Sequence, residues 1–159
     1  MTEQLENEYT TDDDCCLIEL GDTVHNLVRL VHLFERDQIK PYGFTTTQAY
    51  VLIELYNKGS LQMSELSDKL NVKISTMTRV VDKLVRDKYL SRERSADDKR
   101  VVNIYLSIKG TQAASKLIKS INKYYQDIIS FLPSGRVVEV LECTSLLIKA
   151  FEKANPECC

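Results

Sequence analysis

Hydroxyl and basic side chains recur at helical spacing between residues 74 and 86. At about 100° per residue, one side of a helix here is apolar, and the other side carries residues that can form hydrogen bonds or ion pairs. These residues are Ser75, Thr76, Arg79, Lys83 and Arg86. Small hydroxyl residues let a backbone approach base edges in a DNA major groove, an arginine can donate twice to guanine, and later basic residues can reach phosphates. The face is typical of DNA recognition, although many charged helix faces are merely solvated.

A short helix is predicted directly before this one, as a helix-turn-helix requires. Ser64 is placed to cap it, Leu66 and Leu70 face inward, and a tight connection follows. In the second helix, the residues expected to face the core are Ile74, Met77, Val81, Leu84 and Val85. Asp82 and Asp87 lie at the flanks of the polar face, where we expect them to pair with basic neighbours along the helix.

Two alternating segments, residues 89–94 and 100–107, predict a β-hairpin after the second helix. The side chains expected to point inward are Leu90, Val102, Ile104 and Leu106. The tip carries Asp98, Lys99 and Arg100. A hairpin at this place is a wing, which projects a cation into a minor groove while an aspartate holds the guanidinium by a bidentate contact.

Long helices are predicted at both ends of the chain. Residues 17–34 repeat apolar residues at three- and four-residue spacing, and the final third predicts two helices separated at residues 133–135, the first capped by Ser107. Residues 45–47 can cap another helix, which Gly59 ends. The helices at both ends carry wide apolar stripes, and the middle of the chain is expected to have its own core. This favours burial of the stripes against a second chain. The alternative is that the stripes pack against each other within one chain.

Charge is unevenly distributed along the 159 residues. The net charge is −2, but residues 1–37 hold ten acids and two bases, whereas residues 58–110 hold twelve bases and seven acids. A basic middle indicates a polyanionic partner, or simply a solvated face. The length predicts one domain. No apolar run approaches the roughly 20 residues of a membrane helix, and the N-terminus lacks signal character, so we expect no membrane association and a cytoplasmic location.

Two stretches together carry a family resemblance. Asp98-Lys99-Arg100 followed by Leu106 to Gly110 resembles the D-x-R-x5-L-[ST]-x-x-G wing motif of the MarR family, and residues 75–84 are similar to its recognition helix. The resemblance spans residues 17 to 154. It implies a mainly α fold with a small β-hairpin wing: a winged helix-turn-helix part at 41–110, and dimerisation helices at 1–40 and 111–159 within the single domain 1–159.

The resemblance also implies roles for individual residues. The expected protein is an obligate homodimer, usually a repressor, on a palindromic operator in double-stranded DNA. Arg100 would enter the minor groove with Asp98 as its positioning partner, and Ser75, Thr76 and Arg79 would read the major groove. Lys73 stands where these helices often begin with a capping Asp or Ser.

An effector is implied as well, because many relatives bind aromatic anions between their dimerisation and DNA-binding parts. The residues expected to line such a pocket are His32, Phe34 and Tyr50, for a small aromatic or phenolic effector. Aromatic residues at helical spacing are also ordinary core residues. The alternative is a thiol-based redox switch at Cys15 or Cys16, as some relatives sense hydroperoxides near the start of the first helix.

Other functions find little support in the sequence. His25 and His32 are few for a metal site, the five cysteines contain no C-x-x-C pair, and neither a Gly-rich phosphate loop nor a G-x-S-x-G motif is present. We therefore expect no metal, no cofactor and no enzyme activity. A winged helix used only for protein contacts is less favoured, since such domains tend to lose the cationic wing tip.

Overall fold

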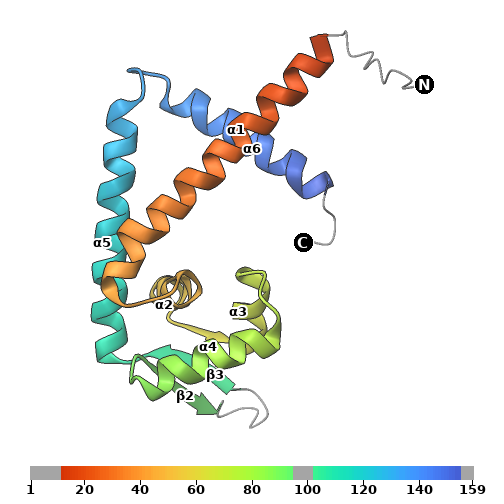
Figure 1. Cartoon of the computed structure of the whole chain (residues 1–159). Coiled ribbons are helices and arrows are strands. Elements are labelled where there is room, and N and C mark those ends of the chain that lie inside the picture. Colours follow the sequence, from red (N-terminus) through yellow and green to blue (C-terminus); the bar gives the residue numbers. More distant parts are fainter. Residues whose placement is uncertain (1–11, 95–101, 155–159) are drawn as a thin grey trace, which may run out of the picture. The chain divides into compact units, whose positions relative to one another are not determined.

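The computed structural model describes residues 12–94 and 102–154 (Figure 1). It is mainly helical with a small three-stranded antiparallel sheet, which confirms the predicted fold class. The chain divides into two compact units, Met1–Asp37 and Gln38–Cys159.

The first unit contains the helix predicted from the apolar spacing, α1, which runs continuously over Asp12–Phe34. A π-helical turn, η1, follows at Glu35–Ile39, and its last two residues belong to the second unit. Most of the large apolar residues along α1, from Leu17 to Val31, stay exposed, whereas Phe34 at its end is buried. Arg36 donates hydrogen bonds of 2.7 and 3.1 Å to the carboxylate of Asp37, and these bonds lower the pKa of Asp37.

The second unit contains the remaining elements. In chain order they are η2 (Lys40–Tyr42), α2 (Thr46–Lys58), β1 (Ser60–Gln62), α3 (Met63–Lys69), α4 (Ile74–Arg86), β2 (Leu90–Arg94), β3 (Val102–Leu106), α5 (Ile108–Phe131) and α6 (Val137–Ala154).

Side-chain caps define the ends of these helices as predicted. The Gln48 N–H donates to Thr45 Oγ1 at 3.3 Å while the Thr45 N–H donates to Gln48 Oε1 at 3.0 Å, so two orphan amides at the start of α2 are satisfied. Gly59 ends α2 with φ of +82°, a conformation that costs glycine little. Ser107 Oγ accepts the Gly110 N–H at 3.0 Å and caps α5.

The sheet has the order β1-β3-β2, with β3 in the middle. Leu61 and Arg92 both face Ile104 in the register. Ile104 and Leu90 are buried as predicted, but the prediction for Val102 was wrong because this side chain is 39% exposed. Val102 pairs with Arg94 at the end of the described part of the hairpin, where both residues are exposed.

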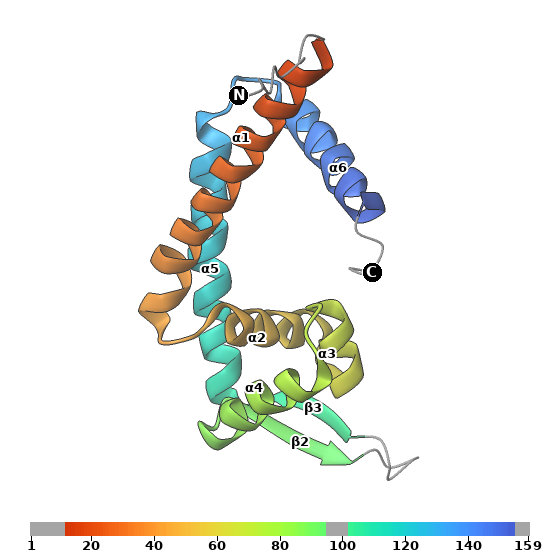
Figure 2. The same cartoon turned by 45° about the vertical axis from the view of Figure 1, so that its right-hand side comes forward.

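The core of the second unit lies where α2 meets α4, α5 and β3. Its largest fully buried side chains include Leu52, Leu55, Leu66, Met77, Leu84, Ile104 and Leu117. Figure 2 shows α2, α3 and α4 gathered beside the β2–β3 hairpin. This packing gives the helix-turn-helix and the wing a common support.

The last helix, α6, has no buried residue along its eighteen residues, all of which are described. Most of its large apolar side chains are exposed in the single chain, while Val137 and Leu147 are half-buried. In the part of the chain that the structure describes, no helix is both long enough and apolar enough to span a membrane.

Candidate nucleic-acid interface

The turn between α3 and α4 is held by a short set of hydrogen bonds. The Val72 N–H donates to the Ser67 carbonyl at 3.0 Å, and the buried hydroxyl of Ser67 donates back to the Val72 carbonyl. Asn71 takes φ of +46°, which asparagine tolerates better than most residues. The turn fixes α4 against α3.

The start of α3 differs from the prediction. The helix begins at Met63, so Ser64 lies inside it and does not cap it. Instead, Glu65 accepts the Gln62 N–H at 2.6 Å. A glutamate at the third helical position can satisfy the amide before the helix, and this is the half of a capping box that does not depend on a hydroxyl residue.

The apolar face of α4 is buried over its middle and not at its start. Met77, Val81 and Leu84 are buried, and Val85 is half-buried. The prediction for Ile74 was wrong, since it is 56% exposed. Ile74 is the first residue of the helix, where the chain has not yet reached the core.

The five polar residues predicted for DNA contact all lie on the exposed side of α4. They are Ser75, Thr76, Arg79, Lys83 and Arg86. Lys73 makes no side-chain cap, and the helix starts at Ile74. Arg86 lies 3.9 Å from Asp87, whereas no acid in the described ranges forms a salt bridge with Arg79 or Lys83. These charges are therefore available to an anionic partner; their roles on DNA remain predictions.

Asp82 pairs across elements and not along its own helix, contrary to the prediction. Its Oδ1 accepts a hydrogen bond of 2.5 Å from Arg92 Nη2 on β2. The pair links the recognition helix to the wing. The strand alternation could have indicated it, because Arg92 lies two residues after the buried Leu90 and so shares the face that is turned toward α4.

The wing consists of β2 and β3, which pair from Leu90 opposite Leu106 to Arg94 opposite Val102. Arg94 is exposed near the far end. The predicted tip residues Asp98, Lys99 and Arg100 lie outside the described residues. The hairpin prediction is confirmed by the pairing, while the minor-groove role of Arg100 stays a prediction.

The residues predicted for an effector pocket have different environments. The side chain of His32 is 73% exposed and lies 3.9 Å from Glu35, Phe34 is buried, and Tyr50 is half-buried in α2. His32 and Phe34 belong to the first unit, and Tyr50 belongs to the second. The second unit has a cavity of about 230 Å³ elsewhere, lined by Tyr42, Phe44, Tyr89, Lys109, Gln112, Ala113 and Lys116.

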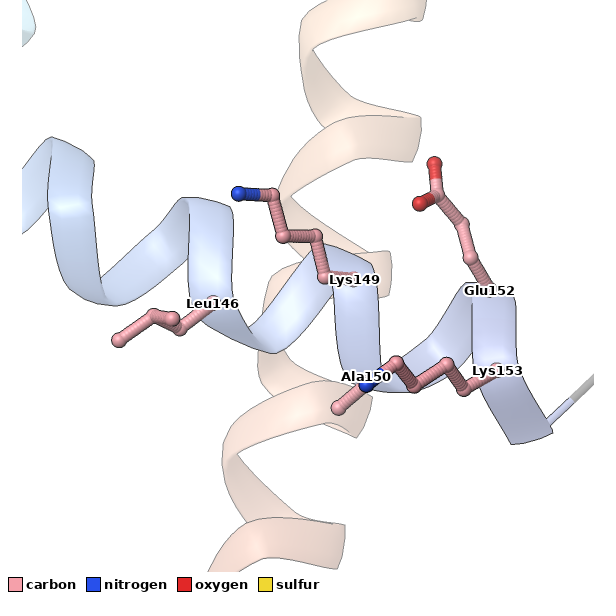
Figure 3. Close-up of a pocket in the computed structure, with 5 residues that line it drawn as sticks. All are labelled: Leu146, Lys149, Ala150, Glu152 and Lys153. Carbon is pink, nitrogen blue, oxygen red and sulfur yellow. The ribbon is translucent and has the colours of Figure 1, made fainter.

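A depression of about 460 Å³ lies along α6 (Figure 3). Its lining residues are Leu146, Lys149, Ala150, Glu152 and Lys153, all from this one helix. The side chains of Lys149 and Glu152 point to one side of the helix, and those of Leu146 and Ala150 point to the other. Such a depression offers no set of converging polar groups to a ligand.

The cysteines and histidines form no metal cluster within the described ranges. Cys16 and Cys143 are exposed free thiols. Cys15 lies in α1, but its side chain is outside the described part, as are Cys158 and Cys159.

Comparisons with known proteins agree with this arrangement. The family model described as the MarR family matches residues 44–102. The HTH-type transcriptional regulator MhqR of Bacillus subtilis is 30% identical over 109 residues, covering 69% of this chain and 73% of that protein. The chain belongs to the MarR family.

Two further comparisons extend the likeness. The HTH-type transcriptional repressor MdtR of Bacillus subtilis is 26% identical over 116 residues, which cover 73% of this chain and 75% of that protein. The crystal structure of Streptococcus pneumoniae FabT in complex with DNA has a TM-score of 0.71 at 19% identity, covering 90% of this chain and 99% of that chain. As a member of the MarR family, the protein is a DNA-binding transcriptional regulator and not an enzyme.

Proposed function

We propose that this MarR-family protein is a homodimeric repressor that binds a palindromic operator and is released by a small aromatic or phenolic effector. The observation that carries the dimer is that α6 has no buried residue and that most of its large apolar side chains are exposed. Val138, Leu141 and Leu146 on this helix are 64 to 67% exposed. Apolar surface left in water costs about 25 cal/mol per Å². A second chain that covers these residues removes that cost.

The operator follows from the symmetry of the dimer. Each chain presents one polar face on α4, and a two-fold axis produces two such faces in opposite directions along DNA. An inverted repeat in double-stranded DNA matches this arrangement. The name of MdtR, a transcriptional repressor, supports repression as the outcome. Because the partner is DNA, we place the protein in the cytoplasm.

Light scattering tests the dimer directly. We expect a mass of two chains at micromolar concentration, and a single-chain mass for Leu141→Glu, which introduces a charge on the apolar face of α6. Glu142→Ala is the control at the adjacent, exposed position. A wild-type protein that remains a stable monomer contradicts the proposal.

The effector part of the proposal rests on the family resemblance, and Tyr50, which is half-buried in α2, is the residue to change. We expect members of a panel of aromatic carboxylates and phenols to release the protein from its operator in gel-shift titrations. The Tyr50→Ala protein should require a higher concentration for release while it binds the operator normally. Release that is unaffected by this change argues against Tyr50 as an effector contact.

A thiol switch is the second candidate, and the exposed free thiol of Cys16 on α1 supports it. Operator affinity before and after mild peroxide, followed by reductant, separates the two ideas. Reversible release that disappears when all five cysteines are changed to serine favours the switch. Unchanged affinity after oxidation removes it.

A further inference from the structure

The start of α5 is fastened to the end of the recognition helix α4. Lys109 Nζ donates to the Asp87 carbonyl at 2.9 Å, Ser107 Oγ donates to the Lys88 carbonyl at 2.7 Å, and the Ser107 N–H donates to the Tyr89 carbonyl at 2.9 Å. Three successive carbonyls after α4 therefore accept hydrogen bonds from Ser107, the cap of α5, and from Lys109 in its first turn. Figure 2 shows the ends of the two helices side by side. We call this set of contacts the α4–α5 joint.

Lys109 stands at an unexpected place for a basic residue. It lies in the first turn of α5, where the partial positive charge of the helix N-terminus disfavours a cation. The same ammonium group lies at the C-terminal end of α4, where a cation is favoured and can satisfy a free carbonyl. It also lies 4.0 Å above the ring of Tyr89. The position of Lys109 is thus explained by α4 and not by its own helix.

The α4–α5 joint is closely packed. A Cβ on Gly110 would lie 2.0 Å from the Tyr89 carbonyl oxygen, so the two backbones approach as closely as only glycine permits. The rings of Tyr89 and Phe44 form a T-shaped pair, with 5.0 Å between ring centroids and an interplanar angle of 73°. Tyr89 is therefore held by contacts with both Phe44 and Lys109.

We propose that Lys109 is a positioning residue for DNA recognition, which fixes the C-terminal end of α4 to α5 and so sets the angle of the reading face. The proposal rests on the proposed recognition of an operator by α4. A helix of this length is about 20 Å long, so a tilt of about 5° at its C-terminal end moves its N-terminal end by about 1.7 Å. Ser75, Thr76 and Arg79 lie toward that end. A displacement of this size breaks hydrogen bonds to bases, whose range is narrow.

The test compares three variants on two DNA duplexes over a range of salt concentrations. One duplex carries the site that the wild-type protein selects from a random pool, and the other has a random sequence. Lys109→Met removes the charge and the donor, Lys109→Arg keeps both, and Lys116→Met removes an exposed charge about two turns further along α5. Thermal unfolding of each variant is measured alongside, and Lys109→Arg tests the contact without removing a charge.

The expected result is a loss of specificity without a loss of phosphate contacts. Lys109→Met binds the selected site on the order of 10-fold more weakly, because a charge-assisted hydrogen bond that orients α4 is gone. Its affinity for random DNA changes by less than about twofold, and the salt dependence stays the same. Lys109→Arg restores affinity for the selected site, and Lys116→Met leaves the ratio of the two affinities unchanged.

Three results overturn the proposal while the proposed function stands. Equal weakening on both duplexes, with the log–log salt slope reduced by about 0.9, makes Lys109 a direct phosphate contact. Unchanged binding by Lys109→Met shows that the joint does not orient α4. An equal effect of Lys116→Met assigns the loss to general charge. If the wild-type protein selects no DNA sequence at all, the proposed function itself fails, and the role of Lys109 fails with it.

Discussion

At the scale of single residues, Arg79 is the side chain of the reading face best suited to identify a base. It is exposed and lies closer to the start of α4 than Arg86, the other arginine on that face. A guanidinium can donate two parallel hydrogen bonds to guanine, which a lysine ammonium does not reproduce.

Replacing Arg79 should relax base preference at one position in each half-site. We expect Arg79→Ala to cost about 1–3 kcal/mol at the preferred base and much less at the other bases. Arg79→Lys is the matched control, because it keeps the charge and the phosphate attraction while losing the paired geometry. Affinities for operators substituted at each position measure the effect. If Arg79→Ala leaves the base preference unchanged at every operator position, this residue makes no base contact.

Replacing Gly110 by alanine has two opposite effects on the stability of the fold. Alanine is a better helix former than glycine by about 1 kcal/mol, and Gly110 lies in the first turn of α5. The added methyl group, however, would lie 2.0 Å from the Tyr89 carbonyl oxygen, which is backbone and cannot move away cheaply. We expect the clash to win, so that Gly110→Ala destabilises the fold by about 1–3 kcal/mol in denaturant unfolding. Gly21→Ala is the control, since nothing lies near a Cβ built there. A more stable Gly110→Ala protein contradicts the close approach.

At the scale of helices and strands, local patterns predicted most of the architecture. The Thr45 and Ser107 caps, the glycine that ends α2 and the buried residues of α4 depend on neighbours a few positions away, and the structure contains them. The exposed face of α4 was predicted for the same reason, because helical spacing alone decides which residues share it.

The wrong predictions concern residues at the ends of helices and strands, or contacts between elements that are distant in the sequence. Ile74 and Val102 obey the spacing of their elements but lie at ends that extend beyond the core. Asp82 pairs with a residue on a strand and not with a neighbour on its own helix. Contacts of this kind depend on how elements pack, which periodicity does not encode.

The start of α6 provides a pH prediction at this scale. Arg136 donates two hydrogen bonds to Glu139, from Nε to Oε2 at 2.8 Å and from Nη2 to Oε1 at 2.5 Å. These bonds lower the pKa of Glu139 below its ordinary value. The stability that the pair contributes is therefore present above the ordinary pKa of a glutamate and is lost as the pH falls through the lowered value. Both groups are exposed, so the contribution to stability is small.

Arg136→Gln tests this pair directly. We expect the pKa of Glu139, followed by NMR titration, to rise toward its ordinary value, because the charged donor that favours the carboxylate is gone. Arg36→Gln serves as the control, since it removes a comparable exposed pair at Asp37 in the other unit. A Glu139 pKa that does not move shows that the hydrogen bonds are not maintained in solution.

At the scale of the whole molecule, polar and apolar surfaces have separate tasks. We propose that the exposed polar face of α4 contacts DNA and that the exposed apolar residues of α6 contact a second chain. The net charge of −2 would suggest poor DNA binding if charge were spread evenly. Basic residues are instead concentrated in residues 58–110, so the local field at the reading face and not the total charge attracts the phosphates.

Half-site spacing tests the two surfaces together, because the contacts of the proposed dimer would fix the distance between two reading faces. We expect highest affinity for half-sites about one helical turn apart, roughly 10 bp from centre to centre. Inserting about 5 bp places the second half-site on the opposite side of the duplex, so affinity should fall to that of a single half-site. Inserting about 10 bp returns the second half-site to the original side of the duplex but leaves the two half-sites too far apart. Affinity should therefore stay low for a rigid dimer. Gel shifts with the three duplexes measure this. Equal affinity for all of them would mean that each chain binds DNA independently, and the proposed dimeric recognition would then be wrong even if the protein is a dimer in solution.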